Sequence, residues 1–168
     1  QARDGFSATA LADGSILVAG GYAGTMQRVA AAERYDPRSG RSTAVGAMAT
    51  PRMAHTATLL ADGRVLVAGG SSASGRLLDT LELYDPATRR FTAAGTLNKA
   101  RHKHAAVRVG DAVLLLGGAG PREYEAQYAD SEVWREGRAR TSPGPRAGSR
   151  NTGATFVTDG AGGKRAVD

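Results

Sequence analysis

The sequence predicts an all-β fold built from repeated four-stranded antiparallel sheets. Three observations predict it: a Gly-Gly pair recurs at a nearly constant spacing, the same short apolar runs and turn residues surround each copy, and no segment has a sustained helical period of apolar residues. The pairs are Gly20-Gly21, Gly69-Gly70 and Gly117-Gly118, with steps of 69 − 20 = 49 and 117 − 69 = 48 residues. A chain of 168 residues is long enough for one ordinary domain, so one architectural unit is expected.

The second copy shows the elements of one unit in order. Residues 55–60 form a short β-prone run, Asp62-Gly63 is a strong two-residue hairpin signal, and residues 64–68 form an apolar strand that ends in the glycines. After a variable loop, residues 80–84 alternate with period two. An Asp-Pro turn then leads to a shorter fourth strand at residues 90–93. Each unit is therefore predicted to be a four-stranded antiparallel meander.

The third copy departs from this pattern at two turns. Gly110-Asp111 replaces Asp-Gly and still predicts a hairpin, whereas the Asp-Pro turn is lost. The spacing from the second glycine to the glutamate of the third strand is 132 − 118 = 14 residues, against 82 − 70 = 12 in the second copy. The third loop is therefore longer by two residues.

A period near 50 residues with four strands per unit is typical of a propeller blade. The Gly-Gly pair, the Tyr-Asp-Pro of the third strand and the aromatic of the fourth resemble the kelch repeat. The units span about residues 3–51, 52–100 and 101–149, with a partial unit at 150–168, so the domain is 1–168. The resemblance implies a kelch-type β-propeller with three four-stranded blades plus the start of a fourth. The chain is then most simply a fragment of a ring of about six or seven blades. Remaining blades of the same chain, or a second copy, would close that ring.

The glycine pairs are expected to have a structural role. Gly20, Gly21, Gly69, Gly70, Gly117 and Gly118 lack a Cβ, so the backbone bends and a bulky neighbour approaches closely. The expected neighbours are Tyr35, Tyr84 and Trp134, which in a kelch-like blade pack across strands and between blades as core residues.

Charged residues keep the same period. Arginines stand at positions 3, 52, 101 and 150, and glutamates recur on the third strands at positions 33, 82 and 132. One interpretation is a ring of ion pairs that holds blade to blade. The alternative is that arginines near the axis present guanidinium groups to an anionic ligand or a peptide carboxylate, and both can hold in different blades.

The histidines offer little for catalysis. His55 and His104 occupy the same repeat position, which favours a structural hydrogen bond to a neighbouring blade. His102 and His104 on one strand face would be half of a metal site, but no further ligands stand at compatible spacing. We expect no catalytic residue, no cofactor and no metal in these residues.

Partner specificity is expected in the variable loops after the glycines, because loops on a rigid scaffold commonly carry function. The third loop is the longest and combines two tyrosines, an arginine and two glutamates. The predicted partner-binding residues are Tyr22, Arg28, Arg52, Arg76, Arg101, Arg122, Tyr124, Tyr128 and Arg150.

Composition excludes several classes of function. The net charge of +6 arises largely from residues 135–150, where five arginines are interrupted by Gly, Ser and Pro without stacking aromatics, so nucleic-acid binding is not expected. There is no cysteine, which removes disulfides and thiolate sites. No apolar run approaches the ~20 residues of a membrane span.

The leading hypothesis is a non-catalytic binding module that recognises a protein, peptide or glycan through the loops on one face. The resemblance also implies an alternative, part of a kelch-propeller enzyme, either a galactose-oxidase-like copper oxidase or a sialic-acid isomerase type. The oxidase signature includes a tyrosine cross-linked to a cysteine, which these residues cannot form. A third hypothesis is a spacer or assembly domain. By resemblance to bacterial kelch segments, the expected location is extracellular, periplasmic or at the cell surface.

Overall fold

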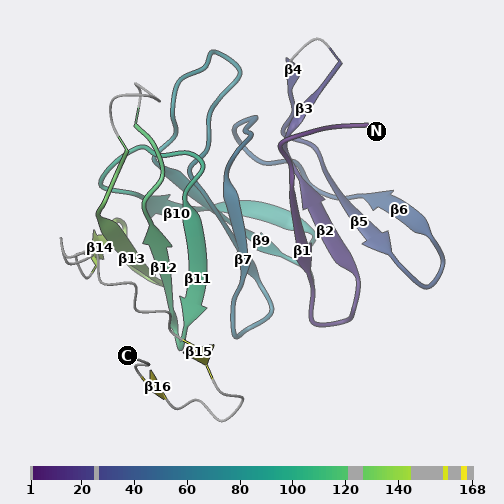
Figure 1. Cartoon of the computed structure of the whole chain (residues 1–168). Coiled ribbons are helices and arrows are strands. Elements are labelled where there is room, and N and C mark those ends of the chain that lie inside the picture. Colours follow the sequence, from purple (N-terminus) through teal and green to yellow (C-terminus); the bar gives the residue numbers. More distant parts are fainter. Residues whose placement is uncertain (1, 25–26, 121–126, 145–156, 159–163, 166–168) are drawn as a thin grey trace.

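The computed structural model describes residues 2–24, 27–120, 127–144, 157–158 and 164–165. Three four-stranded antiparallel sheets follow one another along the chain, which we call blades 1, 2 and 3 (Figure 1). Blade 1 contains β1 (Ser7–Ala10), β2 (Ile16–Ala19), β5 (Ala32–Asp36) and β6 (Arg41–Ala44). Blade 2 contains β7 (Thr56–Leu59), β8 (Val65–Ala68), β9 (Thr80–Asp85) and β10 (Arg90–Thr96). Blade 3 contains β11 (Ala105–Val109), β12 (Ala112–Leu116), β13 (Ser131–Arg135) and β14 (Ser142–Pro143).

Two short hairpins complete the described strands. One is formed by β3 (Tyr22–Ala23) and β4 (Gln27–Arg28) in the first variable loop. The other is formed by β15 (Val157–Thr158) and β16 (Lys164–Arg165), within the partial fourth unit. The described residues include no helix. The prediction of an all-β fold with three four-stranded blades and the start of a fourth is therefore confirmed.

The strands follow the sequence pattern closely, with one difference. The hairpin at Asp62-Gly63 closes with the Leu60 amide donating to the Arg64 carbonyl at 2.8 Å. The fourth strand of blade 2 is longer than residues 90–93, because β10 continues past an irregularity to pair Thr96 with Thr80. The Thr96 amide also donates to the Ala139 carbonyl of blade 3 at 2.9 Å. The extension therefore adds a link between two blades.

Burial along the second strands shows how the blades stack. All four residues of β8 in the middle blade are buried, because a neighbouring blade covers each face. In β2 only Leu17 and Ala19 are buried, and in β12 Leu116 is 39% exposed. Apolar side chains on both faces of β8 thus supply the core on either side of blade 2.

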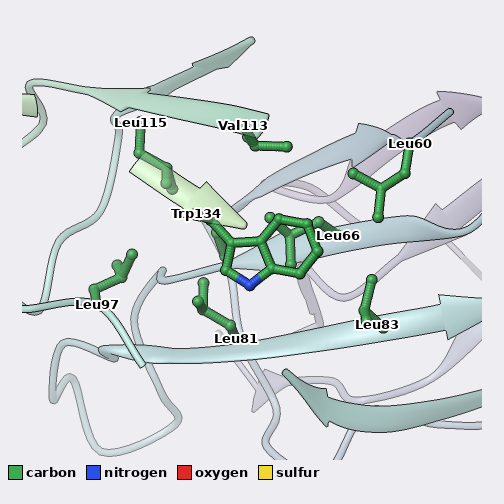
Figure 2. Packing of buried hydrophobic residues seen from close by; sticks show 9 residues of the cluster. Leu60, Leu66, Leu81, Leu83, Leu97, Val113, Leu115 and Trp134 are labelled. Atoms are coloured by element: carbon green, nitrogen blue, oxygen red, sulfur yellow. The ribbon is translucent and has the colours of Figure 1, made fainter. Parts of the chain in front are cut away.

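The cores lie between the blades. Trp134 on β13 lies among leucines of blade 2, including Leu66 and Leu81 (Figure 2). Its Nε1 donates to the Ala94 carbonyl at 3.1 Å, so the indole is both packed and hydrogen-bonded. Tyr84 takes the same position one blade earlier, in the cluster with Leu17, and its ring lies 5.0 Å from that of Phe91. Tyr35 is half-buried.

The neighbours of the glycine pairs differ from the prediction. A Cβ on Gly69 would stand 2.5 Å from the Arg101 carbonyl oxygen, and one on Gly70 would stand 2.9 Å from the Cβ of His55. Both glycines have positive φ, 60° and 98°. Tyr84 instead pairs with Val65, at the far end of β8 from the glycines. The expectation that Tyr35, Tyr84 and Trp134 are the close neighbours of the pairs was therefore wrong, since those neighbours belong to the segments before the first strands and to the variable loops.

Candidate functional site

The strand register places all variable loops at one edge of the molecule. In blade 1, Ser7 at the start of β1 pairs with Ala19 at the end of β2, and Ala19 also pairs with Ala32 at the start of β5. The loop at residues 20–31 and the connection to blade 2 therefore leave from the same end. We call this end the loop edge and the opposite end, with the tight hairpin turns, the turn edge (Figure 1).

The first variable loop is held by its own hairpin and by blade 2. The hydroxyl of Tyr22 donates to Oδ2 of Asp4 at 2.7 Å, and this bond is the main reason why the pKa of Asp4 lies below its usual value. Arg28 donates from Nη2 to the Ser71 hydroxyl at 3.5 Å. Ser71 belongs to the second loop, so side chains from neighbouring loops lie next to one another.

The second variable loop carries an unpaired cation. Ser71 forms bridges with Met53 and Leu77, which fix the base of the loop. The Ser72 amide donates to the Arg76 carbonyl at 2.8 Å and closes its tip. The Arg76 side chain is exposed and forms no ion pair with any residue the structure describes. No residue in the described ranges occupies its guanidinium donors.

The third variable loop is described only in part. Tyr128 is half-buried, and the cationic groups of Lys99 and Arg101 each lie 5.1 Å from its ring centroid. Asp130 pairs with the same two cations, at 3.2 Å from Arg101. Arg122, Tyr124 and Arg150, which were also predicted to bind a partner, lie outside the described residues.

The repeated arginines that the structure describes, Arg3, Arg52 and Arg101, lie in the interior. Arg52 is fully buried and pairs with Glu82 at 2.6 Å, and Arg101 is fully buried and pairs with Glu132 at 2.7 Å. Arg3 pairs with Glu33 in the same way. These are the ion pairs between repeated arginines and glutamates that the first interpretation of the repeated charges expected.

Each buried ion pair also fixes the connection between two blades. Arg52 donates to the carbonyls of Gly69 at 2.9 Å and Thr80 at 3.0 Å, while Glu82 accepts from the Ala49 amide at 2.8 Å. Burial raises the pKa of Glu132, but hydrogen bonds from Thr141, the Asn98 amide and Arg101 outweigh it, so its pKa lies below the usual value. The carboxylate stays ionised beside its arginine.

The histidines at the repeat position link adjacent blades, as predicted. Ser7 Oγ lies 2.8 Å from His55 Nε2, and Thr56 Oγ1 lies 2.9 Å from His104 Nε2. Burial is the largest cause that lowers the pKa of His55 to about 3 and that of His104 to about 4, so both rings are neutral near pH 7. The sequence also contains a signal for these hydrogen-bond partners, since a serine or threonine stands 48 positions before each of the two histidines.

His102 and His104 do not share a strand face. Lys103 between them has a φ of 53°, and β11 begins only at Ala105. Within the described ranges, no group of three His, Asp or Glu side chains is placed to hold a metal ion. The part of the chain that the structure describes also has no helix long and apolar enough to cross a membrane.

Comparison with known proteins gives one family and one structural likeness. The family profile described as "Kelch motif" matches residues 5–49 and 52–98. A solved structure titled "Structure of YjhT" is similar with a TM-score of 0.74 and 16% sequence identity, over 88% of this chain and 53% of that chain. The chain thus spans about half the length of the structure it matches, and at this identity the likeness concerns the fold alone. No curated protein matches the chain.

Proposed function

This chain belongs to the kelch-repeat family, and we propose that it is a non-catalytic binding module whose loop edge recognises a protein, peptide or glycan. Such a fold serves many unrelated partners, so the proposal depends on the side chains at that edge. The observation that carries it is the different use of the arginines. The repeated Arg52 and Arg101 form buried ion pairs, whereas Arg76 in a variable loop is exposed.

The described side chains of the loop edge suit a polar partner. Tyr22 and Arg28 come from the first loop, Arg76 from the second and Tyr128 from the third. Arginine offers planar, charge-assisted hydrogen bonds to carboxylates and other oxygens. Tyrosine adds a rigid ring that packs on a sugar or a peptide at low entropic cost.

The scaffold supports binding because it fixes the base of the second loop. Ser71 is bridged to Met53 in the preceding connection, and the Arg52–Glu82 pair holds that connection to β9. A loop fixed in this way loses less conformational freedom when a partner binds.

The test is binding of the full chain to arrays of glycans and of short peptides, followed by isotherms with the best probe. The variant with Arg28→Ala and Arg76→Ala is expected to weaken binding about tenfold or more, because both substitutions remove charge-assisted donors. Arg41→Ala is the matched control, since Arg41 is an exposed arginine at the turn edge. Absence of saturable binding to every probe, or an equal loss in the control, contradicts the proposal.

A further inference from the structure

A cavity of about 410 Å³ lies on the turn edge, opposite the loop edge. Its walls come from the β1–β2 turn and strands β5 and β6 of blade 1, together with the β9–β10 turn of blade 2. The polar side chains that line it are Asp13, Ser15, Arg34, Asp36, Arg38, Thr43 and Arg89. The volume lies in the range of about 300–1,000 Å³ that small-molecule sites occupy.

The two carboxylates of the cavity are already satisfied by the protein. Asp13 accepts from the Ser15 hydroxyl at 2.6 Å and pairs with Arg34. Asp36 accepts from the Arg38 amide at 2.9 Å and from the Ser39 hydroxyl at 2.9 Å, within its own turn. These hydrogen bonds lower the pKa of both groups, so they stay ionised while their acceptor positions are occupied.

Two of the three guanidinium groups have free donors. Arg34 is held by Asp13 and Ser15. Arg38 and Arg89 donate from their side chains to no residue in the described part of the chain and form no ion pair there. Arginine presents a planar fork of donors that matches carboxylate and phosphate oxygens.

Arg89 occupies a backbone position that glycine takes in blade 1. Its φ is 58°, in the left-handed region, while the corresponding turn of blade 1 uses Gly40. The turn is fixed because the Arg89 amide donates to Asp85 at 2.7 Å and its carbonyl accepts from the Gly46 amide of blade 1 at 2.9 Å. A residue other than glycine in this region carries a conformational cost, which motivates a role for the Arg89 side chain.

A buried phenol, that of Tyr84 on β9, interacts with arginines of the cavity but does not line it. Tyr84 is fully buried, and its hydroxyl has no hydrogen-bond partner among the described residues. Burial raises the pKa of this hydroxyl, and the arginines that act on it most are Arg34 and Arg89, both of which line the cavity. A buried donor without an acceptor is unusual in a folded protein.

We propose that this cavity binds the oxyanion of a small molecule, a phosphate, sulfate or carboxylate group held between Arg38 and Arg89. The Thr43 hydroxyl is a further donor in the wall. The volume exceeds that of a free inorganic anion, so the remainder of a metabolite, such as a monosaccharide, fits beside the anionic group. This site lies at the opposite edge from the proposed partner-binding loops and does not depend on them.

The test is to titrate the full chain with inorganic phosphate, sulfate, acetate and glucose 6-phosphate, and to monitor the amide chemical shifts by NMR. The titrations are done at about 20 mM salt, where screening of charges is weak. Saturable shifts of the Thr43 and Arg89 amides are expected for at least one anion. Tighter binding of glucose 6-phosphate than of phosphate indicates an organic ester, and equal binding indicates the free anion; both support the site.

Variants separate this site from general attraction to a basic protein. Arg38→Gln and Arg89→Gln are each expected to weaken binding about fivefold or more, because each removes one arm of the clamp. Arg90→Gln is the matched control, an exposed arginine next in the chain that does not line the cavity, and it is expected to change affinity less than about twofold. Equal loss in all three variants, or no saturable binding of any of the four anions, overturns the proposal.

The loop-edge variant with Arg28→Ala and Arg76→Ala is expected to bind the anion as the unmodified chain does. Arg89→Gln is in turn expected to leave binding of the best array probe unchanged. Failure of this site and failure of the proposed function are therefore distinguishable.

Discussion

Replacing Glu82 with glutamine tests whether the repeated ion pairs hold the blades together. Glu82→Gln keeps the size of the side chain but removes the anion that pairs with the buried guanidinium of Arg52. The side chains of Arg52 and Glu82 are 0% and 5% exposed, so the remaining charge cannot be hydrated without opening the core. Among the described residues, Arg52 would keep only neutral acceptors, which are the carbonyl oxygens of Thr50, Gly69 and Thr80 and the Thr80 hydroxyl.

The expected loss follows from the contacts. Two charge-assisted hydrogen bonds change, from Arg52 to Glu82 and from the Ala49 amide to Glu82, and each contributes about 1.5–3 kcal/mol. Breaking one partner of a buried pair typically costs about 3–5 kcal/mol, which agrees with this sum. The free energy of unfolding from urea titration is therefore expected to fall by about 3 kcal/mol or more.

Glu136→Gln is the matched control. Glu136 pairs with Arg64 across blades 2 and 3, but its side chain is 58% exposed and that of Arg64 is 28% exposed. An exposed pair contributes no more than about 1 kcal/mol. If Glu82→Gln costs as little as Glu136→Gln, the reasoning about the buried arginines is refuted.

Three further outcomes are expected. Lowering the pH from about 6.5 toward 4 should lower the melting temperature. The unfolded chain binds protons on His55 and His104 in this range, while the folded chain, in which their pKa values are about 3 and about 4, does not. The loss of unfolding free energy approaches about 1.4 kcal/mol per pH unit for each histidine, and His55→Gln should flatten the pH profile of stability. Thr56→Val should reduce stability by about 1–3 kcal/mol in thermal unfolding, since it leaves His104 Nε2 without its partner, and an unchanged melting temperature would count against a link between blades. Tyr84→Phe should leave the free energy of unfolding unchanged or raise it by up to about 1 kcal/mol, because the removed hydroxyl has no acceptor, whereas a clear loss would reveal an interaction that the geometry does not contain.

Local patterns in the sequence were sufficient to predict the strands. The period near 49 residues and the turn residues predicted three four-stranded sheets, and Asp62-Gly63 and Gly110-Asp111 both lie at hairpin turns. The structural role of His55 was also predictable from its repeat position. These features depend on residues close in the chain or on a fixed period.

Contacts between blades were harder to predict. The glycine pairs contact His55, His104 and the carbonyl of Arg101 rather than Tyr35, Tyr84 and Trp134. Such contacts depend on how one sheet is rotated relative to the next. The cavity was missed because its walls come from turns far apart in the sequence. Its one local signal is Arg89, an arginine where blade 1 has Gly40.

The central claim is that the repeated residues build the scaffold and the variable loops bind the partner. The most direct test is NMR mapping of amide shifts on the chain saturated with its best array probe. Shifts concentrated in residues 20–31, 69–79 and 117–130 are the expected result. Shifts concentrated at the turn edge, in residues 11–15, 36–41 and 59–64, would contradict the account.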